Sequence, residues 1–177
     1  DLISDVFSSD LVVTESGFGA DMGFEKLMDI KLRQAGMKGP DCVVIVATVR
    51  ALKMHGGAFT VRPGKKLDPA LVSAVNMPAL ELGCENLRVH IENIRSYGLP
   101  VVVAINRFPD DSAEEVALVQ SRALQFGAVA AVRHTFFLDG SDGGLELARA
   151  VQEVASTSHV GAIHYPYELT DTIEEKM

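Results

Sequence analysis

Short apolar runs alternate along the chain with longer stretches in which apolar residues recur every three or four positions. The runs at residues 43–46 and 101–105 contain only valine, isoleucine and alanine. Such continuous runs are typical of strands covered on both faces, as in a parallel sheet. Further strands are predicted at residues 11–14, 128–132 and 159–164.

The stretches between these runs have helical spacing. Helices are predicted at residues 24–35, 77–97, 113–126 and 142–155, with a shorter helix beginning at residues 68–69 and interrupted at Pro78. Alternation of strands with helices predicts an α/β fold, with a mainly parallel sheet and helices on both faces. A single domain accounts for residues 1–177.

Polar and charged residues follow directly after the first strand that is predicted to be buried. Four polar side chains and two glycines follow it in close succession: Thr48, Arg50, Lys53, His55, Gly56 and Gly57. In open α/β sheets the ligand lies beyond the carboxyl ends of the strands, so this cluster is the first candidate site. The residues alone leave another interpretation open, in which the cations are solvated charges on a helix and the glycines form an ordinary loop.

A second polar loop, residues 106–111, leaves the carboxyl end of the other buried strand. Asn106 can donate and accept hydrogen bonds, and Phe108 offers a flat apolar face on a turn stiffened by Pro109. Such a ring suits stacking on a planar ligand. It could equally be tucked under its own loop.

A third loop, residues 15–23, contains three glycines and follows the strand predicted at residues 11–14. It carries Glu15 and Asp21, and carboxylates near a strand end are the ligands that a phosphate-bound Mg²⁺ takes from a protein. A polar loop with capping residues explains the same pattern.

Three of these segments resemble one family. Residues 46–57, VATVRALKMHGG, resemble the signature of formate-tetrahydrofolate ligase. Residues 14–23, TESGFGADMG, and residues 103–110, VAINRFPD, resemble two further segments of that family. Residues 138–144, LDGSDGG, depart from it, because they lack the lysine of the family's Lys-Gly-Gly-x-Gly-Gly pattern.

The resemblance implies a P-loop-NTPase-like architecture and ATP-dependent ligation of formate to tetrahydrofolate, through formyl phosphate, with Mg²⁺ on the nucleotide. It implies products of 10-formyltetrahydrofolate, ADP and phosphate, and no tightly bound cofactor. The residues it assigns are Thr48, Arg50, Lys53 and His55 for catalysis, Asn106, Phe108, Gly56 and Gly57 for substrate binding, Gly17 and Gly19 for the nucleotide, and Glu15 and Asp21 for the metal.

No G-x-x-x-x-G-K-[ST] loop occurs in the sequence, although an ATP-using domain of this kind needs one to hold the phosphates. The chain is therefore expected to be a central fragment, incomplete at both ends and inactive alone, of an enzyme that forms homo-oligomers. A nucleotide-binding regulatory domain or an assembly domain without ligase activity is the alternative.

Charge and composition exclude other classes of protein. The net charge of −8, with both signs interspersed, argues against a nucleic-acid partner. No apolar run approaches the length of a membrane span, which favours a cytoplasmic protein.

Three further groups of residues receive weaker interpretations. The two cysteines, Cys42 and Cys84, lie in apolar patterns and are expected to be buried thiols. His90 is expected to be structural. Arg62, Lys65 and Lys66 lie on an irregular excursion at residues 58–67, where they are either solvated or attract an anionic substrate tail such as folate polyglutamate.

Overall fold

The computed structural model of the protein describes residues 11–158 and 160–176. Three parallel strands form one sheet in the order β1 (Val43–Ala47), β2 (Val101–Asn106) and β3 (Ala130–His134). Ile45 lies beside Val103, and Asn106 lies beside His134 at the carboxyl end. The predicted α/β fold with a parallel sheet is confirmed.

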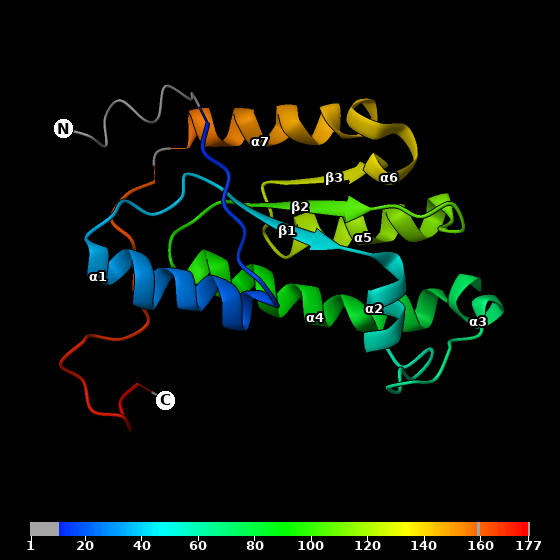
Figure 1. Cartoon of the computed structure of the whole chain (residues 1–177), viewed down its shortest axis with the longest axis horizontal. Coiled ribbons are helices and arrows are strands. Elements are labelled where there is room, and N and C mark those ends of the chain that lie inside the picture. Colours follow the sequence, from blue (N-terminus) through cyan, green and yellow to red (C-terminus); the bar gives the residue numbers. More distant parts are fainter. Residues whose placement is uncertain (1–10, 159, 177) are drawn as a thin grey trace.

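Helices lie on both faces of this sheet, as predicted. In Figure 1, α7 lies on one side of the strands, and α1 and α4 lie on the other. The helical elements are η1 (Ala20–Phe24), η2 (Lys26–Leu32), α1 (Arg33–Ala35), α2 (Val49–His55), α3 (Pro69–Ser73), α4 (Met77–Ser96), α5 (Ala113–Gln125), α6 (Phe136–Asp139), η3 (Gly140–Gly144) and α7 (Leu145–Thr157).

Local sequence chemistry sets the helix boundaries. The capping box of Ser112 and Glu115 forms at the start of α5, and Asp68 caps α3 through its side chain. Pro78 does not interrupt a helix, because α3 ends at Ser73 and α4 begins at Met77. A proline is tolerated in the first turn, where its missing N–H would have no helical partner.

The helix predicted at residues 24–35 and the strand predicted at residues 128–132 form with shifted boundaries. The helical segment begins earlier, at Ala20, and its first two elements are π-helical. β3 begins and ends two residues later than predicted.

Two predicted strands do not form. Residues 11–14 have no regular structure, and Val13 is 91% exposed. Residues 160–164 also form no strand, and residue 159 lies outside the described residues. Val160 and Ile163 instead pack against the core, and the His164 amide donates a hydrogen bond to the Tyr97 carbonyl. Short apolar runs signal burial as readily as pairing, which explains the error at residues 160–164. Residues 11–14 are exposed and pair with no strand among the described residues.

Coverage of the sheet differs between the two apolar strands. β2 is buried along Val101–Ile105, as predicted, but Val44 and Val46 of β1 are exposed. The prediction that β1 is covered on both faces is wrong, because α7 packs mainly over β3 and leaves Val44 and Val46 exposed.

Close packing of two backbones holds α2 at the carboxyl end of the sheet. A Cβ atom on Gly56 would overlap the carbonyl oxygen of Ala79, and one on Gly83 would overlap that of Leu52. The two glycines therefore let α2 and α4 approach to a distance that no side chain would allow. This contact fixes the helix that carries Arg50.

The prediction that both cysteines are buried thiols is confirmed for one of them. Cys84 is fully buried, whereas Cys42 is half-buried, and both are free thiols. Burial raises the pKa of each thiol to about 11, so neither is a thiolate near neutral pH.

Candidate functional site

The candidate site lies at the carboxyl end of the sheet, where three strand ends meet. Thr48 and Arg50 follow β1, Asn106 and Phe108 follow β2, and His134 ends β3. The structure thus brings together residues from two of the three loops proposed from the sequence. Thr48 caps α2, with its hydroxyl oxygen accepting a hydrogen bond from the Ala51 amide at 3.2 Å.

Arg50 and Phe108 form one stacked pair. The guanidinium carbon of Arg50 lies 3.4 Å from the centroid of the Phe108 ring. At this distance the guanidinium covers one face of the ring in a cation–π contact. The Nε atom of Arg50 is buried and has no hydrogen-bond partner among the described residues. The pair therefore joins a flat ring to a guanidinium group whose buried Nε is unpaired within the described residues.

A closed turn presents Phe108 at this position. The Phe108 amide donates to Oδ2 of Asp111 at 2.8 Å, and the Asp111 amide donates back to the Phe108 carbonyl at 3.0 Å. Asp111 is buried, which raises the pKa of its carboxyl group, although the Phe108 amide and nearby Arg50 act in the opposite direction. Phe108 itself is half-buried and stacked against Arg50.

Lys53 is directed into the protein. It is 1% exposed, and its Nζ lies 3.0 Å from Oε1 of Glu115 and donates to the Ala74 carbonyl at 2.9 Å. The same carboxylate accepts hydrogen bonds from the Ser112 and Asn76 amides, at 3.1 and 3.4 Å. This geometry supports a role for Lys53 in holding α2 in place, because no substrate can reach its ammonium group.

Burial alone would raise the pKa of Glu115, but the hydrogen bonds from Lys53 and Ser112 outweigh it and lower that pKa below its usual range. The carboxylate is therefore charged in the folded protein. It joins α2, the segment before α4 and the start of α5 at one buried point.

The remaining residues of the first cluster lie at the end of α2. His55 is exposed, and its side chain forms no hydrogen bond or ion pair within the described residues. Gly57 has a φ of 86°, a left-handed conformation that favours glycine. Gly56 is required by its contact with α4, so packing alone accounts for it.

The loop at residues 15–23 folds back toward α4. A Cβ atom on Gly19 would overlap the carboxylate of Asp21 and approach the His90 ring to 3.1 Å, while Gly17 lies against Gly23. Glu15 and Asp21 are exposed. No group of three His, Cys, Asp or Glu side chains suited to a metal forms in the described part of the chain. These residues alone do not fit a preformed Mg²⁺ site, and the metal and nucleotide roles of the loop stay predictions.

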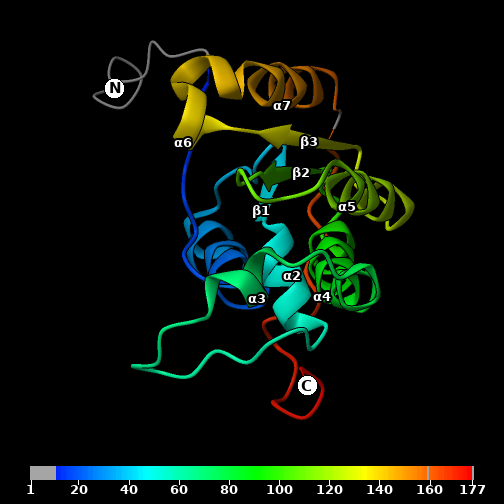
Figure 2. The same ribbon diagram turned by 90° about the vertical axis from the view of Figure 1, so that its right-hand side faces the viewer.

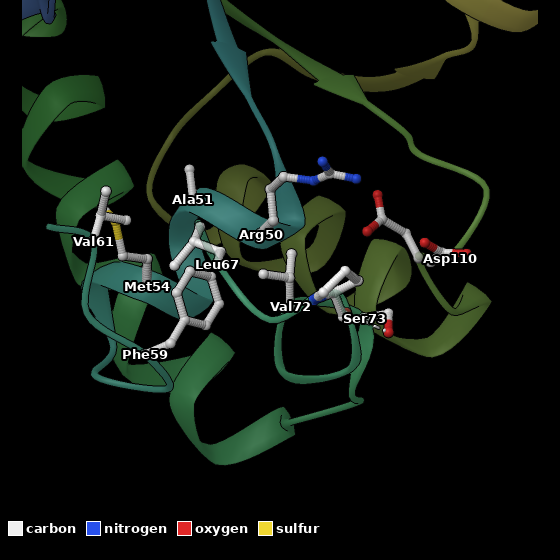
Figure 3. A pocket seen from close by; sticks show the side chains of 11 residues that line it. Arg50, Ala51, Met54, Phe59, Val61, Leu67, Val72, Ser73 and Asp110 are labelled. Carbon is white, nitrogen blue, oxygen red and sulfur yellow. Dashed lines mark hydrogen bonds between the residues drawn. The ribbon is translucent and has the colours of Figure 1, made fainter. Parts of the chain in front are cut away.

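An open groove of about 400 Å³ begins beside Arg50 (Figure 3). Its walls come from α2, α3, the excursion between them and the Phe108 loop. It is lined by Arg50, Ala51, Met54, Phe59, Val61, Leu67, Pro69, Val72, Ser73, Asp110 and Asp111. The lining is mostly apolar, with charged groups at the end nearest Phe108.

Sequence reasoning missed His134. This residue is buried next to Asn106, its Nδ1 has no partner among the described residues, and its ring lies 5.4 Å from that of Phe136. Burial lowers the pKa of the imidazole. The strand was predicted to end at residue 132, which placed His134 in a loop. Its position at the end of a parallel strand was the available signal.

Among the described residues, no helix is both long and apolar enough to cross a membrane.

Comparison with known proteins identifies relatives for nearly the whole chain. Residues 4–177 match the family described as formate-tetrahydrofolate ligase. The formate-tetrahydrofolate ligase of Desulforamulus reducens is 50% identical over 169 residues, which are 96% of this chain and 29% of that protein. The enzyme of the same name from Yersinia enterocolitica is 48% identical over 89% of this chain and 27% of its own length.

A relative with a different name is the mitochondrial C-1-tetrahydrofolate synthase of Saccharomyces cerevisiae, 45% identical over 94% of this chain and 17% of that protein. The chain thus spans less than a third of the length of these curated relatives.

Proposed function

Because this chain belongs to the formate-tetrahydrofolate ligase family, we propose that the full-length protein joins formate to tetrahydrofolate with the use of ATP. The products are 10-formyltetrahydrofolate, ADP and phosphate, and formyl phosphate is the intermediate. The α/β architecture with a parallel sheet, predicted as P-loop-NTPase-like, agrees with this membership.

The stacked pair of Arg50 and Phe108 is the observation that carries the proposal. Ligation requires a flat surface for the pterin next to positive charge for the acyl phosphate. The structure holds a flat ring and a guanidinium 3.4 Å apart at the carboxyl end of the sheet. The other face of Phe108 receives the pterin, and the outer edge of Arg50 faces the acyl phosphate.

In the transfer step, the N10 amine attacks the carbonyl carbon of formyl phosphate. A C–N bond forms, the bond from carbon to the phosphate oxygen breaks, and N10 loses its proton. The leaving phosphate gains negative charge, which the planar guanidinium of Arg50 stabilises through two parallel hydrogen bonds. The amide of Asn106, at the end of β2, is available to both donate to and accept from the pterin edge.

The other residues of the first cluster have supporting roles in this proposal. Lys53 positions α2 through Glu115, so it acts on catalysis through Arg50. The hydroxyl of Thr48 can donate to a phosphate oxygen while its oxygen caps α2. His55 and Gly57 form the exposed end of α2, where they border the substrate.

Gly17 and Gly19 are proposed to approach the nucleotide, and Glu15 and Asp21 are proposed to meet its Mg²⁺. A phosphate-bound Mg²⁺ typically takes only one or two carboxylates from a protein. The homo-oligomeric state and the cytoplasmic location also stay predictions, and one relative is a mitochondrial protein.

A product assay on the full-length protein tests the proposed activity. With formate, tetrahydrofolate, ATP and Mg²⁺ together, 10-formyltetrahydrofolate and ADP should appear in equal amounts, and omission of any one substrate should abolish the product. ATP binding without any formyl product would contradict the proposal and favour a regulatory or assembly domain.

A further inference from the structure

Asp111 and Asp171 close turns of the same kind. Oδ2 of Asp111 accepts a hydrogen bond from the Phe108 amide at 2.8 Å, and the Asp111 amide donates to the Phe108 carbonyl at 3.0 Å. Oδ2 of Asp171 likewise accepts from the Glu168 amide at 2.6 Å, and the Asp171 amide donates to the Glu168 carbonyl at 3.2 Å. Such a turn requires an acceptor oxygen, which asparagine also has, and no negative charge.

The two aspartates differ in their surroundings. Asp171 lies in the C-terminal segment, drawn in red in Figure 1 and Figure 2, away from the loop that follows β2. Asp111 is 6% exposed and lines the groove together with Arg50. Burial takes away the water that would solvate a carboxylate, and a neutral acceptor loses much less. The charge of Asp111 therefore destabilises a turn that does not need it, which points to a second role.

Charged groups from two helices act on this carboxyl group. Burial raises the pKa of Asp111 and outweighs the Phe108 amide, Arg50 and Lys53, which lower it, and Glu115 of α5 adds to the rise. Both cations lie on α2. Lys53 is already held by Glu115 at 3.0 Å, so Arg50 is the cation whose position the charge of Asp111 can set.

Arg50 has no polar partner that would hold it in place. Within the described residues its side chain forms no hydrogen bond and no ion pair, and its guanidinium lies over the Phe108 ring. In Figure 3 this guanidinium points to the side of the groove where Asp110 lies, on the loop that also carries Asp111. Asp110 is exposed, so water and salt screen its charge, whereas the charge of buried Asp111 is screened less.

We propose that Asp111 is a positioning residue of the site and that its negative charge holds the guanidinium of Arg50 over the Phe108 ring. The proposal rests on the proposed function, in which Arg50 faces the acyl phosphate. The Phe108 amide fixes the carboxylate, and the carboxylate attracts the guanidinium that covers the same ring. The site is therefore organised only while Asp111 is ionised.

The test removes the charge and keeps the turn, by Asp111→Asn in the full-length protein. The thermal midpoint should stay near that of wild type, because the amide oxygen still accepts from the Phe108 amide. The kcat of ligation should fall about tenfold with the KM for ATP unchanged, because Arg50 acts on charge that develops during the transfer. Wild-type kcat should also fall as the pH is lowered through the raised pKa of Asp111, and the variant should lose this part of the pH profile.

Three further variants accompany this one. Asp171→Asn makes the same change in the same kind of turn away from the site, so it should leave kcat and its pH profile unchanged. In an Arg50→Met background, Asp111→Asn should lower kcat no further, because Asp111 acts through Arg50. If Asp111→Asn lowers the thermal midpoint, Asp111→Ser supplies a second neutral acceptor for the Phe108 amide, and the same fall in kcat is expected.

Crystal structures of the full-length wild type and Asp111→Asn give a result that does not depend on activity. The Arg50 guanidinium should leave the Phe108 ring in the variant, and an unchanged stack would overturn the inference. Wild-type kinetics in Asp111→Asn, or an equal fall in kcat in the Arg50→Met background, would also overturn it and leave the ligase function standing. Absence of ligation by the wild type would overturn the proposed function alone, because the two structures still decide what holds Arg50.

Discussion

Removal of the carboxylate that pairs with Lys53 should loosen the whole candidate site. Glu115→Gln keeps the shape of the side chain and an acceptor for the Ser112 amide, but it leaves a buried ammonium group opposite a neutral amide. Breaking one side of a buried ion pair typically destabilises a protein by about 3–5 kcal/mol. The Ala74 carbonyl still accepts from Lys53, so we expect about 3 kcal/mol, at the lower end.

A double-mutant cycle separates the pair from its surroundings. Lys53→Met fills the same space without charge, and together with Glu115→Gln it should recover much of the loss, because no unpaired charge remains. Hydrogen exchange of peptides from α2 and the start of α5 reports the local free energy of opening in the full-length protein. If Glu115→Gln lowered this free energy by less than about 1 kcal/mol, or if the two substitutions were additive, the pair would not hold these elements together.

The loss of stability in Glu115→Gln should depend on pH. The pKa of Glu115 is lowered on folding, so its contribution is fully present above the unfolded value of about 4.3 and is lost as the pH falls through the folded value. The difference in stability between wild type and Glu115→Gln should therefore shrink at acidic pH. A difference that did not change with pH would place its origin outside the carboxylate.

Three further predictions concern the site and its support. Arg50→Lys keeps the charge but loses the planar fork and the stacking, so kcat/KM should fall at least about tenfold and the folate KM should rise, and wild-type kinetics would contradict this. Gly83→Ala should lower the thermal midpoint, because its Cβ would overlap the Leu52 carbonyl oxygen, whereas Gly161→Ala, where a Cβ would meet no atom within 4 Å, should not. Burial lowers the pKa of His134, so stability should fall below about pH 6.5, by up to about 1.4 kcal/mol per pH unit, and the non-titrating His134→Gln should remove that slope.

The sequence predicted those elements whose signals are local. The capping box at Ser112 determines where α5 begins, and the continuous apolar run of β2 identifies a strand buried on both faces. The strand ends could be assigned to one edge of the sheet because parallel strands share a direction. This rule predicts from the sequence alone that Arg50 and Phe108 lie near each other.

The sequence pattern did not predict features that depend on contacts between distant parts of the chain. Nothing in the pattern around Lys53 shows that its ammonium group points inward, because its partner, Glu115, lies far along the chain. The exposed face of β1 depends on how far α7 extends across the sheet. Residues 11–14 have strand-like composition and no pairing partner in the described structure, which composition alone does not reveal.

The central claim is that the Phe108 ring is the surface on which this ligase binds the pterin. Equilibrium binding of tetrahydrofolate to the full-length wild type and to Phe108→Ala tests it directly, with ATP as the internal control. Loss of a stacking partner should weaken tetrahydrofolate by about 1–3 kcal/mol, or roughly 5- to 150-fold, and leave ATP affinity unchanged. Unchanged tetrahydrofolate affinity, or an equal loss for both ligands, would contradict the account.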